Sequence, residues 1–323
     1  MKKLPITLCI LAVMLSSCKK DNFVMIESFD FIAEKEQELI EGQEIAIKFS
    51  NVAVKPVEAA EFIDSTKTTL VADDPNVLDV TSVAGGFKVL AKIEGEATLT
   101  MTIADTRGNT FSSQRKVKVT CPYGYVDLGL SVKWATSNLG ASKPEESGKF
   151  FSWGEVKTKD SYNIDTYIWC KGDNTSYTKY CLSKENGTVD NKSVLESGDD
   201  AATAELGGNW RMPTKAEFDE LIKNCTWTES LSEDKSVAVY IIKSKTNNNS
   251  IILPMTGHYE KNVHKSYDLK SEEMEYMYWT NELKSGQTVQ GGVFYADPGW
   301  WEDPQTKGFA RYYGCAVRPV RIK

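Results

Sequence analysis

Histidine is nearly absent from this sequence, and the net charge is not positive. The 323 residues contain two histidines, His258 and His264, and the formal net charge is −7. Zinc and non-haem iron sites are built largely from histidine together with cysteine or carboxylate, and nucleic-acid binding needs a positively charged surface. The composition therefore argues against a histidine-rich metal centre and against a nucleic-acid partner. We expect both histidines, in the polar stretch TGHYEKNVHKSYD, to be exposed to solvent.

Long hydrophobic runs are absent after the first fifteen residues. Lys2 and Lys3 precede an apolar run from Leu4 to Leu15, which is too short to span a bilayer as a mature helix and indicates a secretory signal. The run ends in Leu15-Ser16-Ser17-Cys18, which resembles the lipobox of bacterial lipoproteins, where the cysteine is acylated and becomes the first residue. We predict a lipoprotein signal peptide at 1–17, lipidation of Cys18 and a lipidated tether at 18–22.

The residues after Cys18 bear on location. In many Gram-negative bacteria, an aspartate directly after the cysteine retains lipoproteins at the inner membrane. Here Cys18 is followed by Lys19-Lys20-Asp21-Asn22, so this retention signal is not present. The tetrapeptide is similar to the charged export tags of surface lipoproteins in the Bacteroidota. We predict an outer-membrane lipoprotein that faces outwards and contacts the membrane through its anchor. Removal of residues 1–17 takes away two lysines and moves the charge from −7 to −9.

Five cysteines remain once Cys9 has left with the signal and Cys18 is acylated. An odd number outside the cytoplasm leaves at least one thiol free or paired between molecules. The spacing matches no zinc pattern. We expect one or two structural disulfides, whose partners the sequence leaves open, among Cys121, Cys170, Cys181, Cys225 and Cys315.

Residues 23–121 have the pattern of an all-β sandwich. Short runs such as EIAIKFSNVAV, GFKVLAKI and EATLTMTIAD alternate apolar with polar residues, and Gly, Asp, Asn and Pro separate them. The stretch DDPNVLDVTSVAGGFKVLAKIEGEATLTMTI resembles bacterial Ig-like domains. That resemblance implies an Ig-like spacer without catalytic groups.

The composition changes after Cys121-Pro122-Tyr123-Gly124, because all eight tryptophans follow this point. The second part predicts an α+β domain with antiparallel strands and few helices. The predicted strands are 125–130, 132–136, 150–153, a hairpin turning at 247–249, and the runs EYMYWTNE, GGVFYA and GCAVRPVRI. A polar excursion covers 157–190, and helices are predicted near 199–205 and at 215–224.

The stretch GGNWRMPTKAEFDEL, residues 207–221, contains a helix start. Thr214 with Glu217 three residues later forms a capping box, in which each side chain satisfies a backbone donor of the first turn. Phe218, Leu221 and Ile222 then give the helix one apolar face. We interpret this junction as architecture rather than as a chemical site.

Nine ordered motifs resemble the Fibrobacter succinogenes major paralogous domain, which is common in Bacteroidota surface lipoproteins. They span 122–323 and are YVDLGLSVKWATSNLGA, FFSWGE, GTVDNKSVL, DDAA, GGNWRMPTKAEFDEL, NCTWT, SIILPMTGH, YWTNE and RYYGCAVRPVR. WRMPTKAEF and VRPVR also resemble formylglycine-generating-enzyme-like proteins, which have the C-type-lectin-like fold. Two departures, Ser137 in place of a cysteine and the extra Cys315, put a family disulfide in doubt.

The resemblance implies a definite architecture for 122–323. The last strand pairs near the first, and the capped helix packs across the sheet. Arg211 anchors the turn by donating to carbonyls or a carboxylate. We assign structural roles to Trp210, Arg211, Thr214, Glu217 and Arg318.

The same relatives raise an oxidase hypothesis, since formylglycine-generating enzymes oxidise cysteine and other relatives hold non-haem iron. Two histidines do not supply a facial triad. Cys225 and Cys315 each lie inside a fold-defining motif with no neighbouring base. We predict no catalytic residue and no cofactor, and a binding or adhesion module instead of an enzyme.

The predicted ligand site is the segment Asp297-Pro298-Gly299-Trp300-Trp301-Glu302-Asp303-Pro304. Proline and glycine make it a turn, so its adjacent tryptophans do not both enter one core. Exposed indoles beside carboxylates suit sugar stacking or a protein contact, while the alternative is that the indoles cover their own loop. Candidate ligand-binding residues are Trp300, Trp301, Asp297, Glu302 and Tyr259, with Tyr267, Tyr276 and Tyr278 beside them and Trp279 and Tyr295 assigned to the core.

Asp199, Asp200 and the carboxylates of 297–303 raise the question of a calcium site. Calcium needs six to eight oxygens, and neither an EF-hand-like loop nor the EPN and WND lectin signatures are present. Acidic residues at a helix start are favoured by the dipole, so we predict no metal. We expect a surface lipoprotein that binds glycan or protein, and the alternative is a structural or assembly component of an adhesin or pilus.

The lipobox makes a direct prediction. Cys18→Ala removes the acylated sulfur, so cells that express this variant will yield protein without incorporated radiolabelled palmitate. Cys9→Ala, in the same signal peptide, is the matched control and retains the label. Labelling of the Cys18→Ala protein would contradict the anchor.

Overall fold

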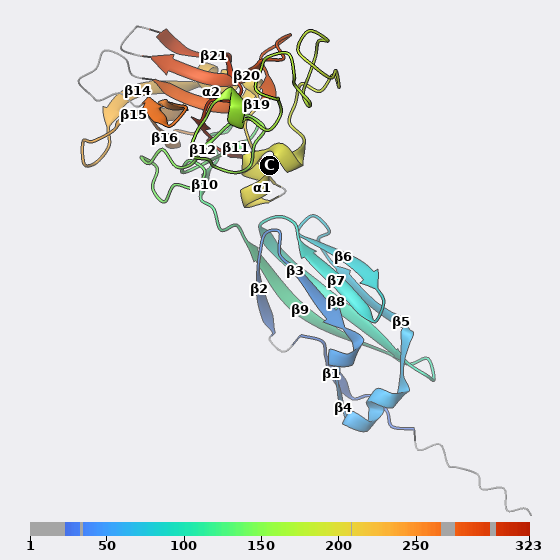
Figure 1. The fold of residues 1–323 in the computed structure, drawn as a ribbon. Helices are drawn as coiled ribbons and strands as arrows, with labels where there is room; N and C mark the ends of the chain where they lie inside the picture. The colour runs from blue at the N-terminus through green and yellow to red at the C-terminus, as the bar shows by residue number, and fades with distance from the viewer. Residues whose placement is uncertain (1–22, 33–34, 208, 266–274, 298–301) are drawn as a thin grey trace, which may run out of the picture.

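The computed structural model describes residues 23–32, 35–207, 209–265, 275–297 and 302–323. The chain is mainly β, with few short helices and several sheets, most of them antiparallel. Among the described strands, no sheet combines residues from before and after 121–124, and the ribbon forms two bodies on either side of this segment (Figure 1). Within the described residues, no helix has the length and apolar character needed to cross a membrane.

The N-terminal body contains two larger sheets that share one core, together with a small antiparallel sheet of two strands, β1 and β4. Four strands form the order β2-β9-β8-β5, with β2 parallel to β9, and three form the order β3-β7-β6. Alternate residues of β8, from Ala97 to Ile103, point into the core, as the period of two requires. The elements are β1 (Ser28–Asp30), β2 (Glu36–Ile40), β3 (Glu44–Lys48), η1 (Phe49–Asn51), β4 (Ala53–Lys55), η2 (Val57–Phe62), β5 (Ile63–Ala72), β6 (Leu78–Val83), β7 (Gly86–Ala91), β8 (Gly95–Asp105) and β9 (Thr110–Thr120).

The C-terminal body contains four sheets of orders β10-β11-β23-β13, β12-β22-β19-β20-β21, β14-β15-β16 and β17-β18. Its strands are β10 (Tyr125–Val126), β11 (Lys133–Ala135), β12 (Phe150–Phe151), β13 (Trp210–Arg211), β14 (Cys225–Leu231), β15 (Ala238–Ser244), β16 (Ser250–Pro254), β17 (His258–Glu260), β18 (Val263–Lys265), β19 (Tyr276–Leu283), β20 (Gln290–Asp297), β21 (Glu302–Ala310), β22 (Cys315–Ala316) and β23 (Val320–Arg321). Its helices are η3 (Ile164–Thr166), η4 (Ser197–Asp199), α1 (Ala201–Leu206) and α2 (Lys215–Asn224).

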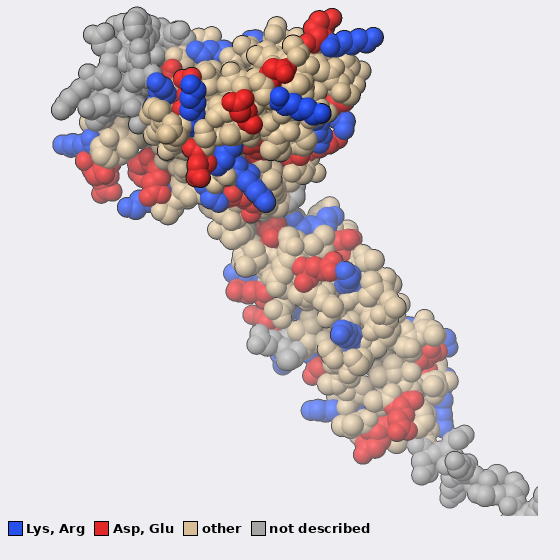
Figure 2. Space-filling view, viewed as in Figure 1, with Lys and Arg blue, Asp and Glu red and all other residues tan. Residues whose placement is uncertain are grey.

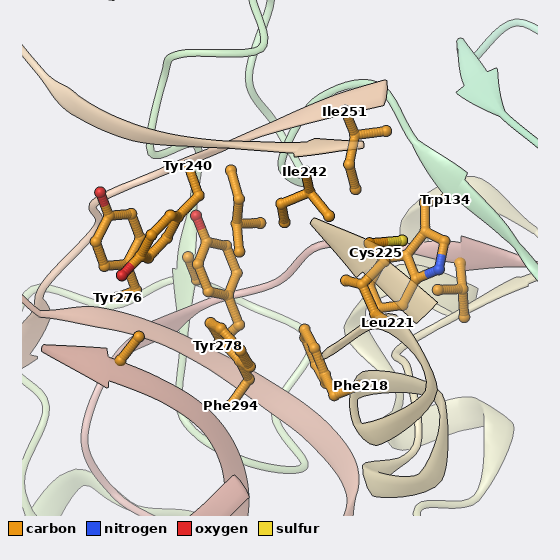
Figure 3. Packing of buried hydrophobic residues seen from close by; sticks show 14 of the residues in the cluster. Trp134, Phe218, Leu221, Cys225, Tyr240, Ile242, Ile251, Tyr276, Tyr278 and Phe294 are labelled. Atoms are coloured by element: carbon orange, nitrogen blue, oxygen red, sulfur yellow. The ribbon is translucent and has the colours of Figure 1, made fainter. Parts of the chain in front are cut away.

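Helix α2 packs across the five-stranded sheet, in the place predicted for the capped helix. Phe218 stacks on Phe294 of β20 with ring centroids 4.9 Å apart and contacts Trp134 of β11 at 5.2 Å (Figure 3). The last strand, β23, pairs with β11 through Trp134 and Val320, so the predicted closure of the last strand near the first is also present. The opposite face of the sheet buries a second cluster around Trp153 and Trp279.

Three sequence predictions about strands are wrong in detail. The segment 297–304 is not one turn, because β21 begins at Glu302 and includes Pro304. β21 is the edge strand of its sheet. An edge strand tolerates proline, because one side of the strand has no neighbour to which a backbone N–H must donate. The run GCAVRPVRI divides into β22 and β23, which lie in different sheets. β5, β14 and the β17–β18 hairpin were not predicted from the sequence.

The expected disulfides are not formed, since Cys121, Cys170, Cys181, Cys225 and Cys315 are all free. The reason is their distribution. Cys225 and Cys315 lie in different core clusters, and Cys121 is at the boundary between the bodies. Cys170 and Cys181 share a small cluster, but each thiol donates to a nearby carbonyl, that of Ile164 and that of Ser183.

Two buried arginines tie distant segments of the C-terminal body together. Arg311 donates to the Tyr167 hydroxyl at 2.8 Å and to the carbonyls of Tyr180, Thr288 and Lys179 at 3.0–3.1 Å. It thereby attaches the polar excursion to the sheet. Arg318 donates to Asn138 Oδ1 at 2.8 Å and to the carbonyls of Ala135 and Ile252 at 3.0 and 2.9 Å, which links β11 to β16.

A third arginine joins the two bodies. Arg321 Nη2 lies 2.6 Å from Glu41 Oε2, and the two side chains are 1% and 6% exposed. The other Glu41 oxygen accepts from Asn209 Nδ2 at 2.5 Å. Nearby, the Tyr125 hydroxyl donates to Glu94 at 2.5 Å, a bond that raises the pKa of Tyr125 to about 12. The contact between the bodies is therefore a buried, charge-assisted network.

This network predicts the effect of removing its carboxylate. Glu41→Leu leaves the Arg321 charge buried without its partner, so the free energy of unfolding of the C-terminal body should fall by about 3 kcal/mol. Tryptophan fluorescence in urea isolates this body, because all eight tryptophans follow residue 133. Glu38→Leu, which breaks an exposed pair with Lys118, is the control and should leave the transition unchanged. Equal transitions for the two variants would show that the buried pair does not stabilise this body.

Candidate functional site

The WRMPT junction is fully occupied by internal contacts. Glu217 N donates to Thr214 Oγ1 at 3.1 Å, and Thr214 N donates to Glu217 Oε2 at 2.8 Å, so the predicted capping box is present. Arg211 donates to the Met212 carbonyl at 3.0 Å and to Glu217 Oε2 at 2.8 Å, the two kinds of acceptor expected for it. Trp210 is 1% exposed. These contacts bind the start of α2 to β13.

The two aspartates that raised a calcium question also have internal partners. Asp200 caps α1 by accepting from the backbone of Ala202 and Thr203 at 3.0 Å, and it accepts from Met212 N at 2.9 Å. Its burial raises the pKa of this carboxyl. Asp199 accepts from Lys179 Nζ and from the Tyr180 hydroxyl, each at 2.5 Å. Among the residues that the structure describes, no three His, Cys, Asp or Glu side chains are grouped to hold a metal ion.

The expectation that both histidines are exposed is wrong. His258 is buried, with Nδ1 2.9 Å from Glu275 Oε2 and its ring against Phe309 and Tyr313. His264 stacks on Tyr259 with centroids 4.6 Å apart, and its Nε2 lies 2.9 Å from the Thr256 carbonyl. The β17–β18 hairpin, which was not predicted from the sequence, places both rings against the body of the protein.

The tyrosines predicted to line the ligand surface have different surroundings. Tyr276 and Tyr278 are 1% and 0% exposed, so they belong to the core and their predicted place on the surface is wrong. Tyr259 is partly buried between Phe150, Tyr162 and His264. Trp279 and Tyr295 are buried, as predicted. Tyr267 lies outside the described residues.

The predicted ligand segment, 297–304, includes the end of β20, the connection 298–301 and the start of β21. Asp297 and Glu302 are paired across the two strands, although the pairing has an irregularity after Tyr295. Trp300 and Trp301 lie between them in the sequence, outside the described residues. The structure thus brings Asp297 and Glu302 together, whereas Tyr259 belongs to the separate β17–β18 hairpin.

The six other tryptophans are all used in packing. Trp134, Trp153, Trp210 and Trp279 are at most 1% exposed. Trp169 donates to the Gly154 carbonyl at 2.7 Å, and Trp227 stacks on Phe294. Within the described part of the chain, no tryptophan is therefore left with a predominantly exposed ring to bind a ligand.

The surface charge does not single out a binding face. Figure 2 shows lysine and arginine side chains interspersed with aspartate and glutamate over both bodies, without a broad patch of either sign on the side shown. Such a surface lacks the positive footprint that nucleic acid needs on that side.

Comparisons with known proteins give no family assignment. No protein-family model matches the chain, and no curated protein matches it. Among solved structures, the chain has weak similarity to SGBP-B of the Bacteroides ovatus mixed-linkage glucan utilization locus in complex with a mixed-linkage heptasaccharide. The identity is 11%, the match covers 88% of this chain and 94% of that chain, and the TM-score is 0.17. The function proposed below rests on the chain's own residues.

The packing of His264 predicts a pH dependence of stability. Burial lowers the pKa of His264 below its usual value of 6.5, so the unfolded chain takes up a proton before the folded chain does. The contribution of this group is fully present above pH 6.5 and is lost as the pH falls towards the folded pKa. His264→Phe keeps a ring against Tyr259 and should reduce the loss of melting temperature between pH 7.5 and pH 5.5. An unchanged difference in melting temperature would contradict this assignment.

Proposed function

We propose that this protein is a non-catalytic, surface-anchored lipoprotein that binds glycans through its C-terminal body. In this proposal, residues 23–121 form an Ig-like spacer, and residues 122–323 form a C-type-lectin-like domain of the Fibrobacter succinogenes major paralogous type. The ligand site is the end of the β20–β21 hairpin, with Trp300 and Trp301 as the aromatic surface and Asp297 and Glu302 beside them.

The main support for this proposal is that the other six tryptophans are packed within the protein. All six described tryptophans are packed against or inside the core, whereas Trp300 and Trp301 belong to a four-residue connection at the end of an edge hairpin. We propose that these two adjacent indoles are available to a ligand. Indole faces stack on the C–H faces of sugars, and carboxylates accept hydrogen bonds from sugar hydroxyls.

The arrangement of the two bodies supports a display function. The first described residues, close to the predicted anchor, lie at the end of the molecule with β1 and β4, while β20 and β21 lie at the opposite end (Figure 1). The network of Arg321, Glu41 and Asn209 holds the bodies together. A lipid anchor at Cys18 would place the hairpin away from the membrane.

The state of the thiols supports a non-catalytic role. A nucleophilic or oxidisable cysteine is usually an accessible thiol with a depressed pKa. Here burial raises the pKa of Cys225 to about 11 and that of Cys315 well above its usual value. Burial also raises the pKa of the Cys121 and Cys170 thiols.

The glycan proposal predicts the behaviour of a double variant. The mature lipoprotein, in a detergent without a sugar headgroup, should bind members of a glycan and mucin array. Trp300→Ala/Trp301→Ala should reduce this binding by at least about tenfold, because stacking on two aromatic rings is lost. The measurement is array binding at matched protein concentration, with melting temperature as the test of folding.

Val263→Ala, at an exposed position of β18, is the control for this experiment. It should bind the same glycans as the unmodified protein. If none of the three proteins binds the array, the glycan proposal is wrong. A stable complex from native membranes would then favour a structural or assembly component of a surface adhesin or pilus.

A further inference from the structure

A cavity beside the junction of the two bodies is unrelated to the β20–β21 hairpin. It lies between Pro122–Gly124, the segment 135–142 that starts at the end of β11, and the end of α1. Its volume is about 540 Å³. That value falls within the range of about 300–1,000 Å³ that is typical of small-molecule sites.

The cavity combines apolar and aromatic walls. Leu139 and Pro319 are buried side chains that line it. Tyr123 forms one wall and is 43% exposed, while its ring is held edge-on against Trp210 with centroids 6.2 Å apart. The exposed face of the Tyr123 ring suits the C–H face of a sugar.

A pair of opposite charges lies on the rim. Lys149 Nζ is 2.9 Å from both carboxylate oxygens of Glu205, and the side chains are 46% and 26% exposed. Gly140 permits this pair, because its φ is +76° and a Cβ there would lie 2.6 Å from the Lys149 side chain. The pair has no net charge, so it offers one donor group and one acceptor group to a ligand that is itself neutral.

Two hydroxyl groups of the lining have no partner among the residues that the structure describes. The Ser137 and Tyr123 hydroxyls make no hydrogen bond to any of these residues. By contrast, the Thr136 hydroxyl, next to Ser137, donates to the Gly124 carbonyl at 3.2 Å. The cavity therefore keeps two donor–acceptor groups available in addition to the charged pair.

We infer that this cavity is a second carbohydrate site, which takes one neutral sugar unit. Lys149 donates to one hydroxyl of the sugar and Glu205 accepts from its neighbour, so the pair recognises adjacent hydroxyl groups. The Ser137 and Tyr123 hydroxyls supply further hydrogen bonds, and the Tyr123 ring covers the C–H face. The site does not include Trp300 or Trp301, so it can be tested independently of the hairpin site.

Titration with simple glycosides tests this inference. The probes are the methyl glycosides of glucose, galactose, mannose and N-acetylglucosamine, added to high-millimolar concentration. Binding to the mature lipoprotein, in a detergent without a sugar headgroup, is measured by saturation-transfer NMR. We expect at least one glycoside to bind the unmodified protein and to bind the Trp300→Ala/Trp301→Ala variant equally well.

Two cavity variants should bind the glycoside more weakly. Lys149→Met/Glu205→Gln removes the charged pair. Ser137→Ala removes a hydroxyl that has no partner among the described residues, so we expect this variant to fold. We expect about tenfold weaker binding for the first variant and a smaller loss for the second. Lys157→Met, an exposed lysine outside the cavity, is the control and should bind normally.

The outcomes separate the two sites. Equal affinity of the cavity variants and the unmodified protein would overturn the cavity site, as would the failure of every glycoside to bind. Loss of glycoside binding in the Trp300→Ala/Trp301→Ala variant, with the cavity variants unaffected, would assign the binding to the hairpin instead. Melting temperatures of all variants identify any that fail to fold.

Discussion

Burial of three guanidinium groups from residues 311–321 is the constraint on which the C-terminal body depends. A guanidinium taken out of water must have hydrogen-bond acceptors in fixed positions, because an unpaired buried charge is strongly destabilising. Arg311 and Arg318 meet this need mainly with backbone carbonyls, whereas Arg321 uses the carboxylate of Glu41. Burial lowers the pKa of Arg318 to about 10, which still leaves it protonated at neutral pH.

These arginines connect parts of the chain that have little regular structure of their own. Arg311 holds a polar excursion whose described part contains only one short 3-10 helix, η3, and Arg321 holds the second body against the first. Both proposed sites lie on this framework. One is carried by the edge of the five-stranded sheet, and the other lies between the linker and α1. A site keeps its geometry best when rigid elements support it.

Local signals in the sequence were predictive where a few neighbouring residues decide the outcome. The capping box of Thr214 and Glu217 depends on two residues three positions apart, and it is present. The failures involve long-range partners. Pro304 indicated a turn, but an edge strand tolerates proline, and only the sheet order reveals that β21 is an edge. The hairpin that buries His258 and His264 was hidden in a polar segment.

The sequence by itself determined the alternation that makes the chain mainly β and the start of α2, because each depends on residues close together in the chain. For the same reason it predicts a lipid anchor at Cys18. It also pointed to Trp300 and Trp301. Tertiary structure decided which polar side chains are free. Asp200 caps a helix and His258 lies against Glu275, whereas Ser137 has no partner among the residues that the structure describes. Segments far apart in the sequence form the cavity around Ser137, and such a juxtaposition leaves no local pattern.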